Sequence, residues 1–171
     1  MVMLILLDHL LAAVHLLSGA AWFGALVYRT FFVDPKAMRF FHEGTEFERY
    51  SLDLAHGMRY VVMLALVTCG LSGFVLLGLR WNSSQGWLAF MGIKSGLWII
   101  AFGLFGYISW VFWPKRVFAT RTELPRLHRQ GFLLAFTMIV IAATGMMLGQ
   151  LAKSTACLVW IDGWLLAAWP G

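Results

Sequence analysis

Four residues that could do chemistry recur at a constant interval near the start of the chain: Asp8, His15, Trp22 and Arg29 lie seven residues apart. Seven residues are nearly two helical turns, so on an α-helix the four side chains point the same way, about 10 Å apart. Ionisable groups inside a membrane nearly always face protein rather than lipid. We therefore expect His15, near mid-membrane, to belong to a ligand or redox site, with Trp22 and Arg29 beside it; the alternative is a buried, hydrogen-bonded histidine. Small residues occupy the same side: Ala12, Ser18, Gly19 and Ala25.

His56 and His128 form a second candidate pair, because the offset of 72 residues between them also places Ser72-Gly73 on Thr144-Gly145. Imidazoles from facing helices can hold haem b, so the pair predicts its two axial ligands. His15 lies too deep to share that iron and would serve a second haem, a quinone or a proton site. The alternative is that both are ordinary residues at helix starts. Arginines at the same level could bind the haem propionates: Arg29, Arg59 and Arg129.

Lys94 lies about two turns into a later apolar run. We expect it to face inward near Asp8 or His9 and to pair with a carboxylate or an anionic ligand; alternatively, its long stem reaches the membrane surface. Met146 and Met147 could bind Cu(I) or a haem iron through sulfur, although methionine also serves as flexible packing.

The elements that must position these residues are membrane helices. Of the 171 residues, 61% are hydrophobic and 12% charged, and the mean hydropathy is +0.78, which is typical of an integral membrane protein and excludes a nucleic-acid partner. We predict an all-α integral membrane fold, a four-transmembrane-helix bundle of two parallel helix-hairpin repeats. Residues 1–153 form that domain, and residues 154–171 form a Trp-rich interfacial tail. The predicted spans are residues 4–32, ending before Asp34-Pro35, then 56–79, 87–113, ending at Pro114, and 127–151.

Charge placement predicts the orientation. Basic connectors follow the first and third spans, whereas the opposite side carries only Arg80 and Lys153. By the positive-inside rule the connectors face the cytoplasm of a bacterial inner membrane, and both termini are periplasmic. The first apolar run lacks a preceding basic region, so we do not interpret it as a cleaved signal peptide. Cys69 and Cys157 form no C-x-x-C motif, which excludes c-type haem attachment.

Three short motifs resemble one superfamily. The segment from Ala13 to Arg29, with its histidine, small residues and Trp-Phe-Gly, resembles the first helix of the CopD (copper-resistance D) and HemJ-type protoporphyrinogen oxidase superfamily. Gly86 to Lys94 resembles the start of its third helix, and the elements Ser72-Gly73 and Thr144-Gly145 resemble the Thr-Gly elements that end its even-numbered helices. In HemJ-type members a histidine stands two residues before the lysine, where this chain has Gly92.

The resemblance implies a compact four-helix membrane unit. HemJ-type members bind haem b and oxidise protoporphyrinogen IX, and CopD members are associated with copper uptake. Three functions are therefore expected: a haem b electron-transfer subunit or quinone-linked oxidoreductase, a protoporphyrinogen IX oxidase, and a copper transporter. The first would act with a quinone or porphyrin in the lipid bilayer and with another membrane or periplasmic redox subunit.

Overall fold

Every regular element is helical in the part of the chain that the computed structural model describes, which is residues 2–41, 44–81, 84–154, 157–159 and 161–162. In each of two long helices a π-helical turn joins two α-helical segments, so that each of these helices is one continuous rod made of three labelled segments. The elements are α1 (Val2–Tyr28), η1 (Arg29–Val33), α2 (Asp34–Phe40), α3 (Gly44–Leu79), α4 (Gln85–Tyr107), η2 (Ile108–Phe112), α5 (Trp113–Val117) and α6 (Leu124–Leu151).

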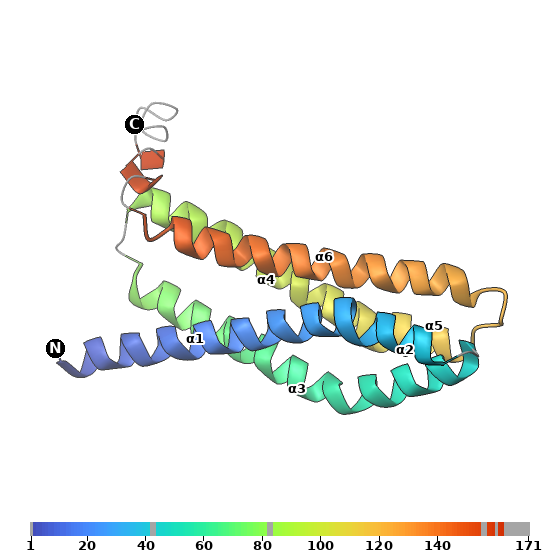
Figure 1. Ribbon diagram of the computed structural model, residues 1–171. Helices are drawn as coiled ribbons and strands as arrows, with labels where there is room; N and C mark the ends of the chain where they lie inside the picture. Colours follow the sequence, from blue (N-terminus) through green and yellow to red (C-terminus); the bar gives the residue numbers. More distant parts are fainter. Residues whose placement is uncertain (1, 42–43, 82–83, 155–156, 160, 163–171) are drawn as a thin grey trace.

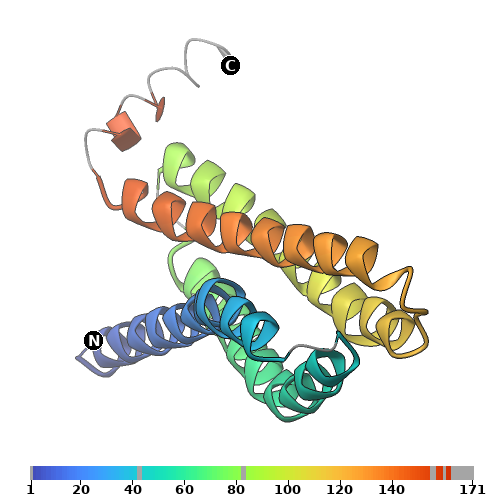
Figure 2. The same ribbon diagram turned by 45° about the vertical axis from the view of Figure 1, so that its right-hand side comes forward.

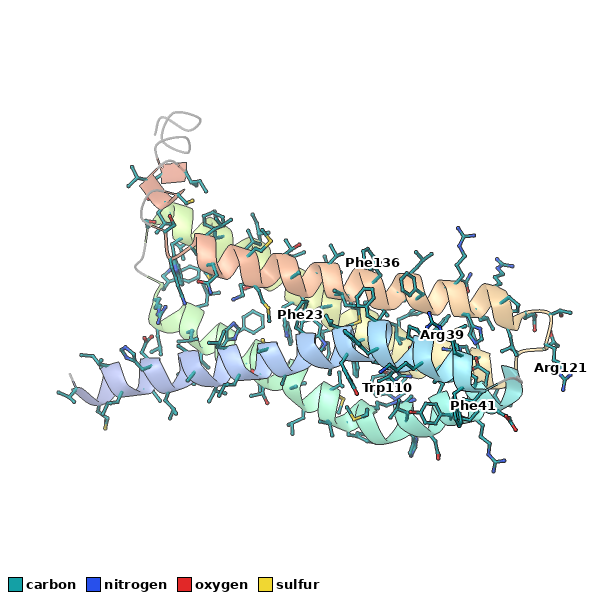
Figure 3. All side chains as sticks on the ribbon, viewed as in Figure 1. Phe23, Arg39, Phe41, Trp110, Arg121 and Phe136 are labelled. Atoms are coloured by element: carbon teal, nitrogen blue, oxygen red, sulfur yellow. The ribbon has the colours of Figure 1, made fainter. Side chains whose placement is uncertain are left out.

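The four rods run roughly lengthwise, as two pairs (Figure 1). α1 packs mainly along α3, and α4 packs mainly along α6; the contacts between the pairs are fewer (Figure 2). The connection from α2 to α3 and that from α5 to α6 lie at the same end of the molecule, and Figure 3 shows Arg39 and Arg121 toward that end. One core cluster joins the pairs: Trp22, Leu66, Ala101, Phe105, Met138 and Ala142.

The outer surface of all four rods is apolar. Leu17 is 69% exposed, Leu64 67%, Ile99 59% and Leu133 52%, a pattern that water would penalise and lipid would not. Four helices are long and apolar enough to cross a membrane: Val2–Phe40, Glu46–Leu79, Gln85–Val117 and Leu124–Leu151. The expectation of four membrane-spanning helices agrees with this finding.

The helices do not end at the prolines, which corrects the expected ends at Asp34-Pro35 and Pro114. Proline clashes with the carbonyl group four residues earlier in an α-helix. Here a π-turn precedes each proline, and the hydrogen bond spans five residues instead of four: the Asp34 N–H donates to the Arg29 carbonyl, and the Trp113 N–H donates to that of Ile108. The wider turn lets both helices continue, to Phe40 and Val117.

The second long helix, α3, begins at Gly44 and not at the expected residue 56. Its additional turns carry a buried stripe at intervals of three to four residues, formed by Phe47, Glu48, Ser51 and Ala55, each at most 7% exposed. Burial of this stripe, rather than hydropathy, explains why a charged segment is helical.

The tail is described only in part. Trp160, Trp164 and Trp169, on which its interfacial role was predicted, lie outside the described residues. Asp162 is described, and its Oδ1 accepts a hydrogen bond of 2.5 Å from the Gly86 N–H. This carboxylate therefore satisfies a free N–H in the first turn of α4.

Candidate functional site: two cavities between the helix pairs

Two cavities of similar size lie between the helix pairs, and each is lined by all four rods. The His15 cavity, of about 460 Å³, includes His15, Trp22, Lys94 and Gly145 in its lining. The π-turn cavity, of about 440 Å³, includes Thr30 and Ser109 from the two π-turns, together with His128. Both volumes fall in the range of about 300–1,000 Å³ that is usual for cofactor and ligand sites.

The imidazole of His15 is fixed by α3. Its Nδ1 lies 2.8 Å from the Cys69 carbonyl oxygen. Because a carbonyl oxygen can only accept, Nδ1 carries the proton, and the lone pair is on Nε2. The Lys94 Nζ lies 3.1 Å from this Nε2 and can donate to it. A histidine whose Nδ1–H is held by a backbone carbonyl is oriented as metal-binding histidines commonly are.

Glycines on α3 and α6 make room for these side chains. A Cβ at Gly73 would lie 2.9 Å from the His15 Cε1, and one at Gly149 would lie 3.1 Å from the Lys94 Nζ. At Gly70 a Cβ would collide with the indole of Trp98. Side chains therefore fill the space beside these three glycines. Gly145 differs, since nothing lies within 4 Å of its Cβ position.

Cations gather around the His15 cavity, which Arg80, Lys94 and Lys153 line. Arg80 is paired with Asp8 through its Nη2 at 2.6 Å, and this hydrogen-bonded carboxylate raises the pKa of Arg80. Lys94 faces inward, as expected, but its neighbour is His15 and not Asp8 or His9. Among the described residues no carboxylate lies within ion-pair distance of Lys94.

Trp22 completes the row on α1. It is 6% exposed, lines the His15 cavity, and its Nε1 has no hydrogen-bond partner among the described residues. All four side chains of the row contact α3 or Arg80, the residue that follows it. Asp8 accepts hydrogen bonds from Arg80, the His15 ring bonds the Cys69 carbonyl, and Trp22 shares the core cluster with Leu66. Arg29 donates to the carbonyl oxygen of Ser51, at 3.4 Å.

A buried ionic cluster borders the π-turn cavity. The Glu48 Oε1 accepts hydrogen bonds from the Arg116 Nη2, at 2.6 Å, and from the His128 Nε2. Glu48 and Arg116 are 7% and 8% exposed. The sequence interpretation missed Glu48 because it placed this residue in a surface connector. The spacing of Phe47, Ser51 and Ala55 was the signal that could have found it.

Three arginines line the π-turn cavity, and they differ in their partners. Arg29 lies 3.6 Å from the Asp34 carboxylate, and Arg116 is held by Glu48. Both guanidinium groups also lie over the indole of Trp113, at 5.0 and 4.6 Å. Arg59 has only the ring of Trp110, at 5.9 Å, and no carboxylate partner in the described ranges.

The structure does not bring His56 and His128 to one cavity. His128 lines the π-turn cavity, whereas His56 is exposed on α3 and is absent from that lining. The reason is the early start of α3: His56 is the thirteenth residue of its helix, and His128 is the fifth residue of α6. Arg129, expected to bind a propionate, is also exposed.

Possible metal ligands are sparse. The described residues contain no group of three or more His, Cys, Asp or Glu side chains that could hold a metal ion. Met91, Met146 and Cys69 line the His15 cavity, while Met147 is 66% exposed.

No protein family, curated protein or solved structure matches this chain.

Proposed function

We propose that the chain is a haem b-binding membrane protein that moves electrons, with His15 Nε2 as an axial ligand in the His15 cavity. The observation that carries this proposal is the bond from the His15 Nδ1 to the Cys69 carbonyl oxygen. It leaves Nε2 as the nitrogen with a lone pair and orients the ring, which are the two requirements of a ligating imidazole.

The residues around the cavity fit a haem. The walls are mainly apolar, and Gly145 leaves open space on α6. Lys153 is a suitable partner for one propionate, and Arg80 could hold the other with the N–H groups that Asp8 does not use. Lys94 would have to give up its contact with the His15 Nε2, which its flexible stem permits. Met146, on α6 in the same lining, is the best candidate for a second ligand. When bound, haem supplies one-electron chemistry that amino acids lack.

We propose further that the four helices form a bundle of two parallel hairpin repeats in a bacterial inner membrane, with both termini periplasmic. The pairing of α1 with α3 and of α4 with α6, and a π-turn just before Pro35 and Pro114, support the repeat. A reporter inserted near Glu123 should be cytoplasmic. A periplasmic signal at that position would reverse the assigned orientation.

The decisive experiment is a reduced-minus-oxidised absorption spectrum of the purified protein, with iron analysis. We expect a b-type spectrum that His15→Ala abolishes. His9→Ala is the matched control, because His9 lies on the same helix, is exposed, and bonds only the Ile5 carbonyl in its own helix. His128→Ala should also leave the spectrum unchanged. If His128→Ala bleaches it and His15→Ala does not, the haem lies in the π-turn cavity.

Copper transport is the second candidate, because Cys69, Met91 and Met146 line the cavity that contains His15. Sulfur and imidazole ligands favour Cu(I). Under this function, cells that express the protein accumulate copper, and Met146→Leu with Met147→Leu abolishes the accumulation. Copper-free protein with a full haem complement would exclude it. A protoporphyrinogen oxidase would instead convert added protoporphyrinogen IX to the porphyrin.

A further inference from the structure

The π-turn cavity has the features of a separate binding site. π-turns are frequently found at functional sites, and here two of them, from different rods, line one cavity. Each contributes a small hydroxyl side chain that is almost fully buried: Thr30 is 6% exposed and Ser109 is 4% exposed. Neither hydroxyl group has a hydrogen-bond partner among the described residues. Because both residues line the cavity, each hydroxyl can donate a hydrogen bond to an oxygen of a bound ligand.

A third polar group in the lining also lacks a partner. Arg116 is 8% exposed, and its Nη2 is bound to Glu48, but its Nε has no partner in the described part of the chain. The guanidinium Nε–H can only donate, and the two hydroxyls can donate as well. The unpaired polar groups of this cavity therefore call for hydrogen-bond acceptors.

The charges around the cavity favour a neutral ligand over a phosphate. Arg29 is paired with Asp34, and Arg116 with Glu48, so that of the three arginines only Arg59 has no carboxylate partner within the described ranges. Phosphate sites are usually built from several free cations or from a cluster of backbone N–H groups. One arginine can polarise a carbonyl oxygen, whereas among the described residues it would be the sole cation without a carboxylate partner for a phosphate group in this cavity.

The walls favour a flat, apolar molecule. Phe105, Phe112 and Trp113 line the cavity together with aliphatic side chains. Aromatic walls pack well on planar rings. The preferred ligand is thus a planar apolar ring whose only polar atoms are acceptor oxygens.

We propose that the π-turn cavity binds the ring of a membrane quinone, with Thr30, Ser109 and Arg116 donating hydrogen bonds to its carbonyl oxygens. This site is separate from the His15 cavity and does not depend on a haem there. It gives the protein a lipid-soluble partner for the exchange of electrons.

Binding of decylubiquinone and of a short-chain menaquinone to the purified full-length protein tests the proposal, for example by quenching of tryptophan fluorescence. Thr30→Val and Ser109→Ala remove one hydroxyl each with little change in shape. Each should weaken binding about three- to tenfold, as expected for one hydrogen bond, and the double variant more. Ala135→Phe, which places a ring in the cavity lining, should abolish binding.

Thr137→Val is the matched control, because its hydroxyl is exposed and donates to the Leu133 carbonyl of its own helix. It should bind quinone as the wild type does. Quinone binding that is equal in wild type and in the Thr30→Val/Ser109→Ala variant would overturn the proposal. Binding of phosphatidylglycerol that depends on Arg59, with no binding of quinone, would overturn it in favour of an anionic lipid. The haem spectrum should be unaltered in Thr30→Val, because Thr30 does not line the His15 cavity. A protein that binds quinone but no haem would refute the proposed function and leave the quinone site standing.

Discussion

The two cavities have nearly the same volume and draw on the same four rods, yet they are made in different ways. The His15 cavity arises where a side chain is missing, at Gly145, while Gly73 makes room for the His15 ring. The π-turn cavity arises where the backbone itself widens, at η1 and η2. Their polar groups differ accordingly. In the first, His15 and Lys94 face each other, and no carboxylate among the described residues lies within ion-pair distance of Lys94. In the second, two of the three arginines are paired with carboxylates, and Arg59 is not paired in the described ranges.

A buried charge is therefore not by itself a sign that a group is open to a ligand. The Glu48 cluster is the more conspicuous feature, but its charges are paired through Glu48 Oε1 and join α3, α5 and α6, although Glu48 Oε2 and Arg116 Nε have no partner among the described residues. The His15 Nε2 lone pair faces only the Lys94 ammonium group, on a flexible stem, so a ligand that displaces this contact can bind it. Substitutions can test whether the polar groups of each cavity stabilise the fold or bind a ligand.

The largest effect should follow the removal of the Glu48 carboxylate. Glu48→Ala leaves the buried Arg116 guanidinium unpaired, which we expect to cost about 3–5 kcal/mol in the free energy of unfolding. Unfolding in detergent micelles, followed by circular dichroism, measures the loss. Replacing both charges, in Glu48→Leu with Arg116→Met, should recover most of it, since the penalty lies in the uncompensated charge. If Glu48→Ala is as stable as the wild type, the cluster has no structural role.

A smaller effect is expected at the wall of the His15 cavity. Gly73→Ala places a methyl group 2.9 Å from the His15 Cε1, so the imidazole must shift; we expect a cost of about 1–3 kcal/mol and a large decrease in bound haem. Gly78→Ala is the control on the same helix, with open space at its Cβ position. It should be neutral or more stable by about 0.5–1 kcal/mol, because alanine is the better helix former. Equal haem occupancy in both variants would show that the position of His15 does not matter.

A substitution at Trp22 tests whether its unpaired indole N–H donates to a ligand in the His15 cavity. Trp22→Phe removes the Nε1–H that lacks a partner. The gain from removing an unsatisfied group offsets lost packing, so we expect unfolding of the ligand-free protein to change by less than about 1 kcal/mol. Haem affinity, measured by titration into the ligand-free protein, should decrease severalfold if a bound ligand accepts from this group. Unchanged affinity would assign Trp22 to packing alone.

The smallest effect is expected at the outer end of the row. Asp8 and Arg80 form two hydrogen bonds, at 2.6 and 3.0 Å, but their side chains are 26% and 41% exposed. Such pairs contribute about 0.2–1 kcal/mol, and salt screens them. Asp8→Asn should therefore lower stability slightly in dilute buffer, and the difference should shrink in high salt. A loss above 2 kcal/mol would mean that this end is as well buried as the Glu48 cluster.

Much of the fold follows from apolar length, and the inward direction of the row on α1 follows from its seven-residue period. Hydropathy could not find the start of α3, because the turns around Glu48 are charged and become helical only through burial. The pairing of Lys94 with His15 was also out of reach. The α4 segment is apolar on all sides, so its periodicity did not show which face meets α1. The 72-residue offset between His56 and His128 wrongly predicted that they share one site, because the position of each histidine along its rod depends on where its helix begins.

The π-turn at η1 also changes the rotational phase of the helix. The row of Asp8, His15, Trp22 and Arg29 would continue at Lys36 if the seven-residue period held. A π-turn holds about one extra residue, which rotates everything beyond it by roughly 100°, the angle of one residue in an α-helix. Accordingly Ala37 is buried at 8% exposure, and Lys36 is exposed. The added residue in η1 thus turns the Lys36 ammonium group away from the protein interior to an exposed face, and the rod continues through the proline without a break.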